Sequence, residues 1–217
     1  NVGRTGSINP YAILNPVQIG GANIRQATLH NEDYIKSKDL RIGDAVIVER
    51  AGEVIPQVVH PIPSKRDGSE TELQMPTNCP VCNHVIFSSQ DEAMSYCVNS
   101  GCPAQTSKMV EHFVSKGAMD IQGLGPKQIQ VLITENLIED ASDLYDLKNH
   151  QERAMEIERI GETSLDNLLT AISASRQQPL ERVLTALGIK HVGPEVAELL
   201  SQRFQNIDSI IEATETE

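Results

Sequence analysis

The sequence predicts a multidomain α+β protein, because its pattern changes twice along the chain. Alternating apolar and polar residues run to about Pro63, and all four cysteines then fall between Cys79 and Cys102. From about Pro103 onward, apolar residues recur at spacings of three and four, the period of an amphipathic helix. A chain of 217 residues is long for one compact domain. We therefore expect a small β-barrel over 1–70, a four-cysteine segment over 71–106 and an all-α domain over 107–217.

The first segment is predicted to form a small, partly open barrel. The stretch "DAVIVERAGEVIPQVV" predicts a strand over 45–50, a tight turn at Ala51-Gly52 and a second strand over 53–59. Pro56 indicates an edge or a bulge in that second strand. "ANIRQATLH" predicts another strand, and "NEDYIKSKDL" a short helix between strands. The polar stretch "PSKRDGSETE", residues 63–72, is predicted to be a linker.

The cysteines follow the pattern C-x2-C-x14-C-x4-C, which is typical of a zinc site. Tetrahedral Zn²⁺ takes four soft ligands, and each close pair supplies two of them. Because four thiolates leave no coordination position open, the predicted role of the metal is structural rather than catalytic. Two disulfides or four unrelated thiols are the alternatives, and His84 and His112 are weaker candidates as substitute ligands. The predicted zinc ligands are Cys79, Cys82, Cys97 and Cys102.

The helical segment contains a threefold repeat. Its copies are "IQGLGPKQIQVLI", "IERIGETSLDNLL" and "IKHVGPEVAELLS", beginning at Ile121, Ile157 and Ile189. Each has two apolar residues three apart, then a glycine, then a small or apolar residue, then a leucine. The pattern predicts three helical hairpins. The residues after the bends are Ile129, Leu165 and Ala197, followed by Leu132, Leu168 and Leu200, and the bend glycines are Gly125, Gly161 and Gly193.

A glycine at each bend would leave the first amides of the next helix facing outward, at the positive end of its dipole. Such amides bind anions, and several in series suit a phosphate backbone. Lys127 and an extra glycine, Gly123, favour the first hairpin as the strongest phosphate site, whereas Glu162 and Glu195 weaken the later copies. As an alternative, the glycines only cap helices. A nucleotide-binding loop fits less well, because the third glycine of the dinucleotide fingerprint is missing and no strand precedes it.

The formal net charge of −12 is a poor indication of nucleic-acid binding, and aromatic residues for base stacking are scarce. The excess of acid lies entirely beyond Glu70, however, since residues 1–70 hold eight basic and eight acidic side chains. Backbone amides also bind phosphate without formal charge. The composition therefore leaves DNA open as a partner. No apolar run is long enough to cross a bilayer, so no membrane partner is expected.

The stretches "VGRTG", "ATLHNED", "RIGDAVIVERAGEVIPQVV", "CPVC", "HFVSKGAMDIQGLG" and "LGIKHVG" occur in an order that resembles the C-terminal two-thirds of bacterial NAD⁺-dependent DNA ligases. The resemblance implies an OB-fold domain, a four-cysteine zinc finger and a helix-hairpin-helix domain that close round nicked duplex DNA as a clamp. It also implies that Arg4 and Thr5 lie where the OB domain meets DNA near the nick. The hairpin amides implied to contact DNA are those at Gly123, Gly125, Gly161 and Gly193.

In this family the whole enzyme moves AMP from NAD⁺ to a lysine and then to the 5′-phosphate of a nick, and the 3′-hydroxyl completes the seal in replication and repair. We expect the adenylation domain, with its K-x-D-G lysine and its need for NAD⁺ and Mg²⁺, to lie outside this sequence. The chain is then a fragment, inactive alone, monomeric and cytoplasmic, with three of the family's four hairpins. The alternatives are a non-catalytic DNA-binding repair module and a zinc-stapled interaction scaffold.

Overall fold

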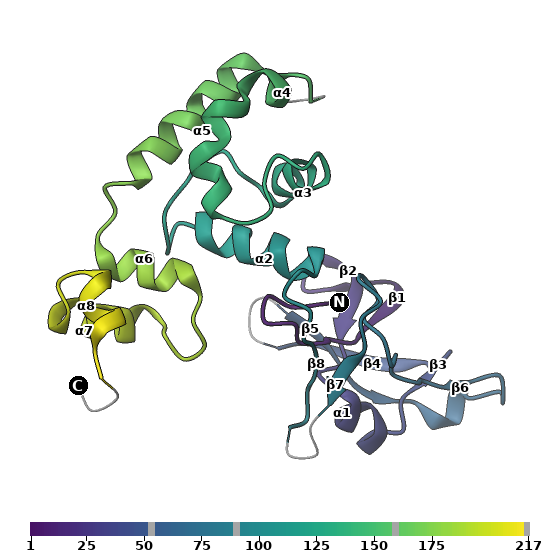
Figure 1. The fold of residues 1–217 in the computed structure, drawn as a ribbon. Helices are drawn as coiled ribbons and strands as arrows, with labels where there is room; N and C mark the ends of the chain where they lie inside the picture. Colours follow the sequence, from purple (N-terminus) through teal and green to yellow (C-terminus); the bar gives the residue numbers. More distant parts are fainter. Residues whose placement is uncertain (52–54, 89–91, 158–160, 215–217) are drawn as a thin grey trace. The chain divides into compact units, whose positions relative to one another are not determined.

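A computed structural model describes residues 1–51, 55–88, 92–157 and 161–214. The chain forms two compact units, Asn1–Gln105 and Thr106–Glu217, which are drawn in Figure 1. The first unit contains the β-strands and the cysteines, and the second is helical. The predicted α+β class is therefore confirmed.

A four-stranded sheet with the order β1-β2-β5-β4 forms the main part of the first unit. Two antiparallel hairpins, β1–β2 and β4–β5, meet through one parallel pair, Thr28 with Gln57. The bulge in the second hairpin lies at Val59 rather than at Pro56, because Ile47 pairs with His60 and Val48 with Val58. Gly52 of the predicted turn lies outside the described residues. The strands are β1 (Tyr11–Ile19), β2 (Ala22–Thr28), β4 (Val46–Ala51) and β5 (Ile55–Pro61).

The predicted short helix is α1 (Glu32–Ser37), and it packs against the sheet. Its N-cap is Asn31, whose side chain accepts a 2.8 Å hydrogen bond from the Tyr34 amide and so satisfies one of the first amides of the helix. The Tyr34 hydroxyl donates to the Val58 carbonyl at 2.9 Å and ties the helix to β5. Apolar residues from the strands, the helix and the following loop form one small core, which is Ala27, Leu29, Ile35, Leu40 and Val58.

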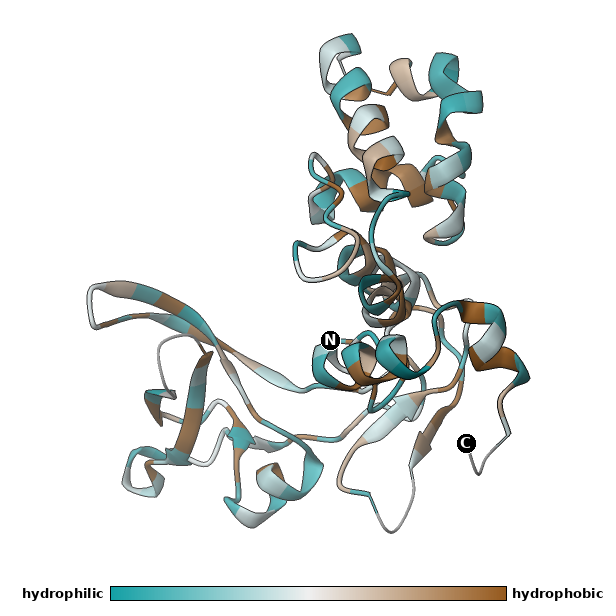
Figure 2. Cartoon of the chain, turned by 90° about the vertical axis from the view of Figure 1, so that its left-hand side faces the viewer, coloured by the Kyte–Doolittle hydropathy of each residue, from teal (hydrophilic) through white to brown (hydrophobic). Residues whose placement is uncertain are grey.

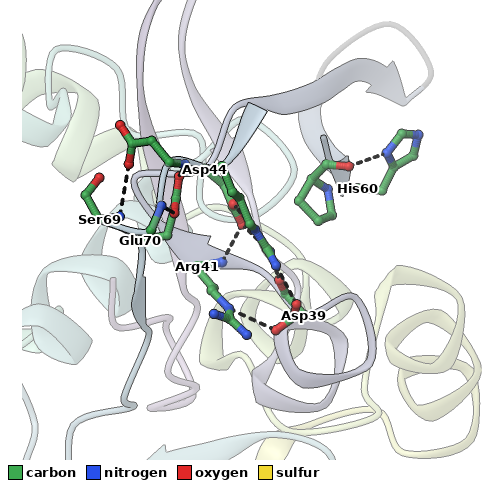
Figure 3. A network of polar contacts seen from close by, with 10 residues as sticks. Asp39, Arg41, Asp44, His60, Ser69 and Glu70 are labelled. Carbon is green, nitrogen blue, oxygen red and sulfur yellow. Dashed lines mark hydrogen bonds and ion pairs between the residues drawn. The ribbon is translucent and has the colours of Figure 1, made fainter. Parts of the chain in front are cut away.

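The polar stretch 63–72 is part of the barrel and not a linker, contrary to the prediction. It holds a 3-10 turn, η1 (Pro63–Lys65), and a strand, β6 (Thr71–Glu72), that pairs with β3 (Arg41–Ile42). Between them, Arg66 forms ion pairs with Asp44 at 2.7 Å and with Asp39 at 2.6 Å. Figure 3 shows Asp39, Arg41 and Asp44 in this network. The charged residues of this stretch resemble a linker in sequence because their ion-pair partners lie far away in the chain.

The second unit has one large apolar core, and its helices carry the spacing that the sequence predicts. Figure 2 shows how hydrophobic and hydrophilic residues are distributed along the strands and helices. The described helices from Pro103 onward are each too short or too polar to cross a bilayer. They are α2 (Pro103–Val114), α3 (Pro126–Thr134), η2 (Ser142–His150), α4 (Gln151–Met155), α5 (Glu162–Ser175), α6 (Leu180–Leu187), α7 (Pro194–Arg203) and α8 (Ile207–Glu212).

Polar contacts fix α6 to the loop after α2. The Arg182 guanidinium donates from Nε to the Ala118 carbonyl at 2.6 Å and from Nη2 to the Lys116 carbonyl. These are carbonyls beyond the end of α2, where no further helical amide follows to pair with them. The Nε2 of His112 lies 2.7 Å from the Thr185 carbonyl oxygen. His112 therefore has a role in holding the helices together, within the unit that contains no cysteine.

Candidate metal centre and nucleic-acid interface

The four cysteine sulfurs form one compact cluster. Their Sγ atoms all lie within 4.8 Å of one another, with 3.5 Å between Cys82 and Cys97 and 3.9 Å between Cys79 and Cys102. An ideal tetrahedron with Zn–S bonds of about 2.3 Å has sulfurs about 3.8 Å apart, so the cluster has the size that Zn²⁺ needs. All four cysteines are described, and none of them is in a disulfide.

Tight turns and two short strands bring the cysteines together. Asn83 adopts a left-handed conformation with φ of 57°, and its amide donates to the Cys79 carbonyl at 2.9 Å, while the Cys79 amide donates to the His84 carbonyl at 2.8 Å. The second pair begins in a small antiparallel sheet of β7 (Ile86–Ser88) and β8 (Ser95–Cys97), because Cys97 is the last residue of β8 and pairs with Ile86. Cys102 immediately precedes α2, so the helix starts directly at the cluster.

The surroundings of the sulfurs shift the pKa values of the thiols in opposite directions. A hydrogen bond from the His84 amide, assisted by Asn99, lowers the pKa of Cys82 to about 6. Burial raises the pKa of Cys97 to about 12 and also raises the pKa of Cys102. A buried thiolate needs an opposing charge, and a metal ion supplies it. His84 takes part through its backbone, as a donor to the Cys82 sulfur.

Arg4 and Thr5 lie at the tip of a small hairpin at the start of the first unit. The hairpin pairs Val2 with Ile8, and hydrogen bonds from the Gly3 amide to Ser7 and from the Gly6 amide to Gly3 close the turn. Thr5 is exposed, and Arg4 is partly exposed. The turn therefore presents these two residues together, as a contact with a large ligand would require.

Each of the three bend glycines is the N-cap of a helix and not a C-cap. Gly125, Gly161 and Gly193 have φ and ψ of −88° and 170°, −83° and 157°, and −89° and −177°. Among the described residues no side chain caps any of these three helices. The amides in the first turns of α3, α5 and α7 therefore have no side-chain cap, although Pro126 and Pro194 supply no amide of their own, and uncapped helix starts of this kind suit an anion such as phosphate.

The three helix starts differ in charge. Lys127 follows Pro126 in α3, and this fully described helix has no acidic residue in its first turn, whereas α5 and α7 have Glu162 and Glu195 there. The loops before the first and third starts are similar in shape, since Gly123 has φ of 95° and His191, at the same place in the third copy, has φ of 70°. Arg159 of the second copy lies outside the described residues. His191 thus keeps the left-handed turn without a glycine.

A literal K-x-D-G sequence does occur, at 65–68, although we expected no adenylation motif in this sequence. Its residues hold a surface turn. Arg66 is paired with Asp44 and Asp39, the Asp67 carboxylate accepts from the Ser69 amide at 2.9 Å, and Gly68 has φ of 93°. Lys65 is exposed on η1. A nucleotide-binding lysine belongs in a concave site. We therefore interpret residues 65–68 as a structural turn that matches the adenylation motif by chance.

Comparisons with known proteins agree with these features. Residues 1–70 match the profile of the NAD-dependent DNA ligase OB-fold domain. Residues 78–104 match the NAD-dependent DNA ligase C4 zinc finger domain, and residues 182–217 match the helix-hairpin-helix motif. The β-rich region, the cysteine cluster and the third hairpin are thus each similar to a known family.

Similar proteins include bacterial DNA ligases. The chain is 52% identical to the DNA ligase of Rubrobacter xylanophilus over 203 residues, which are 94% of this chain and 29% of the relative. It is 45% identical to that of Syntrophus aciditrophicus over 217 residues, covering 100% of the chain and 32% of the relative. For Clostridioides difficile the identity is 46% over 98% of the chain and 31% of the relative. The chain thus spans 29–32% of the length of these relatives, and the expectation that it equals two-thirds of such a ligase is wrong.

Proposed function

Because this chain belongs to the NAD-dependent DNA ligase family, we propose that it is the part of such a ligase that encloses nicked duplex DNA. Its three predicted domains, over 1–70, 71–106 and 107–217, would form a clamp. The clamp would hold the 3′-hydroxyl against the activated 5′-phosphate, which lowers the barrier through proximity. Nick sealing would serve replication and repair, in the bacterial cytoplasm at the nucleoid.

The observation that carries this proposal is the set of three uncapped helix starts. Their uncapped amides would give phosphate ligands without positive side chains, which is how a chain with a net charge of −12 could bind DNA. Arg4 and Thr5 would contact the DNA near the nick. The residues proposed to contact DNA are Arg4, Thr5, Gly123, Gly125, Lys127, Gly161 and Gly193.

The four cysteines would hold Zn²⁺ as a structural crosslink of the finger. The spacing of the four sulfurs supports that assignment. NAD⁺ and Mg²⁺ would serve the whole ligase and would not bind here, because the only K-x-D-G letters form a surface turn. Alone, the chain would be a monomer that binds nicked DNA and neither binds NAD⁺ nor seals nicks.

The decisive experiment is a binding titration of the zinc-loaded chain against matched nicked and intact duplexes at several salt concentrations. We expect tighter binding to the nicked duplex and an affinity that falls steadily as salt rises, because phosphate contacts release counterions. Equal affinity for both duplexes would favour a general DNA-binding repair module. No salt-dependent binding to either would favour the interaction scaffold, a role that the acidic composition suits.

A further inference from the structure

The hairpin that carries Arg4 and Thr5 is hydrogen-bonded to the cysteine finger. The Ile8 amide donates to the Ser95 carbonyl at 2.8 Å, and the Cys97 amide donates to the Gly6 carbonyl at 2.8 Å. Ser7 pairs with Tyr96 in an antiparallel bridge between them. The hairpin therefore extends the small β7–β8 sheet by one more short strand on the side of β8.

The apolar side of the same hairpin belongs to the cysteine core. Val2 is 1% exposed and Ile8 4% exposed, and both pack in one cluster with Cys79, Cys97 and Cys102. The core of the barrel is a separate cluster built from residues between Ala27 and Val58. Residues 2–8 fall within the OB-fold match in sequence, yet their buried side chains pack with the finger.

At Gly6 the hairpin lies directly against the backbone of the finger. Its φ is 83°, and a Cβ placed there would lie 2.2 Å from the carbonyl oxygen of Cys97. Only glycine fits, both because the conformation is left-handed and because the obstacle is backbone. The same Cys97 carbonyl accepts a 2.8 Å hydrogen bond from the Gln105 side chain, so it has little freedom to move away. A ligand cysteine and the DNA-facing turn thus share one rigid contact.

We propose that strand β8 of the finger positions the Arg4–Thr5 turn for nicked DNA, with Gly6 as the positioning residue. This inference rests on the proposed function, in which Arg4 and Thr5 contact DNA. The finger then contributes to DNA binding by holding a turn of the barrel segment in place, in addition to stabilising its own fold. Metal at the four cysteines orders β8, and β8 orders the turn.

The test compares Gly6→Ala with Gly21→Ala. Both glycines are left-handed, with φ of 83° and 79°, but a Cβ at Gly21 meets nothing within 4 Å. The pair therefore separates the close contact with Cys97 from left-handed backbone strain. For each zinc-loaded variant, the measurements are zinc content, hydrogen exchange of the Ile8 and Cys97 amides, and affinity for a nicked duplex. Arg4→Ala is measured alone and combined with Gly6→Ala.

We expect Gly6→Ala to keep its zinc, to speed exchange of both amides and to weaken DNA binding about tenfold, as loss of one side-chain contact would. Gly21→Ala should bind DNA normally. Arg4→Ala should weaken binding in the parent chain and have little further effect beside Gly6→Ala, because the turn is already displaced. Full additivity of the two substitutions, or faster exchange with unchanged affinity, would overturn the positioning role.

The two proposals fail differently. If Arg4→Ala alone leaves the affinity unchanged, the assignment of Arg4 as a DNA contact is wrong, whatever Gly6→Ala does to amide exchange. Should Gly6→Ala lose zinc, Ile8→Ala serves as the second variant, because it trims the hairpin side of the shared core and leaves the Cys97 carbonyl untouched. It should also speed exchange of the Cys97 amide and weaken DNA binding, and normal affinity with fast exchange would again contradict the inference.

Discussion

The two units of this chain are stabilised in different ways. In the described residues, the helical unit has one core of 16 buried residues, whereas the first unit has two clusters of five buried residues each. One of the small clusters includes three of the four cysteines, and an ion-pair network lies beside the other. Small domains commonly need such additions because they bury too little apolar surface. The comparison implies that metal and pH act on the first unit and core packing on the second.

Metal removal should produce the largest difference in stability between the two units. Chelation of zinc should unfold the finger from Thr77 to Pro103, because structural zinc supplies on the order of 10–16 kcal/mol in small zinc peptides near neutral pH. Hydrogen exchange is the measurement. Amides of Cys79 and Cys97 should lose protection, whereas those of Ile129 and Leu165 in the helical core should keep it. Unchanged exchange and unchanged proteolysis after complete metal removal would show that the finger folds without the ion.

Core truncation should act on the other unit. Leu132 is 1% exposed in the large core, so Leu132→Ala should cost about 2–5 kcal/mol through lost burial and the cavity left behind. Urea unfolding followed by helical circular dichroism measures it. The matched control is Leu199→Ala, since Leu199 is 65% exposed on α7 and should change stability little. The metal affinity of the finger should be the same in both variants, and a loss of zinc in Leu132→Ala would contradict independent stabilisation of the two units.

Acid should act next, through the network of Arg66. The Arg66 guanidinium holds the pKa of both Asp44 and Asp39 below the ordinary value of 3.8. A carboxyl with a lowered pKa in the folded state binds fewer protons than in the unfolded state. Its contribution is therefore present above about pH 4 and is lost as the pH falls through the folded-state pKa.

The measurement is the urea midpoint of the first unit between pH 3 and pH 7, for the parent chain and for Arg66→Met. The parent midpoint should fall toward acid, and Arg66→Met should lower the neutral-pH midpoint and flatten that fall. We expect a smaller loss than for Leu132→Ala, because Asp39 is largely exposed and Asp44 keeps a 2.8 Å hydrogen bond from the Arg41 amide. An unaltered pH profile in Arg66→Met would mean that other carboxyls govern acid stability.

The same contrast explains what could be predicted from sequence. Helical period and the repeat at Gly125, Gly161 and Gly193 are local patterns, so the helical unit is largely predictable, as are the clustering of the four cysteines and the strands. The first unit depends on partners far apart in the chain. Arg66 binds Asp39, 27 positions away, and Gly6 contacts Cys97. Such pairings leave no periodic signal, which is why the stretch 63–72 looked like a linker and residues 2–8 like barrel alone.

The smallest predicted effect concerns how the helical unit contacts DNA. In the first unit the proposed contacts are side chains, whereas in the helical unit they are amides and the Lys127 side chain. Occupying those amides should therefore weaken binding without weakening the fold. Aspartate is a good N-cap residue, and the extended backbone at Gly125 and Gly193 accepts it. Its carboxylate would bind the exposed amides and repel phosphate. At Gly125 the neighbouring atom is only the flexible end of the Gln128 side chain, and at Gly193 nothing lies within 4 Å.

Gly125→Asp should therefore weaken affinity for a nicked duplex on the order of tenfold, the size expected from charge at a helix start. Gly193→Asp should have less effect, because Glu195 already lies in the first turn of α7 while α3 has Lys127. Fluorescence anisotropy at fixed salt measures the affinities, and thermal unfolding should be unchanged or slightly raised in both. Gly125→Asn, a neutral N-cap, separates occupation of the amides from charge repulsion and should give an intermediate loss. Equal losses for Gly125→Asp and Gly193→Asp would mean that the first hairpin has no special role. A loss of helix stability would mean that the first amides of the helix are not free to accept the new cap.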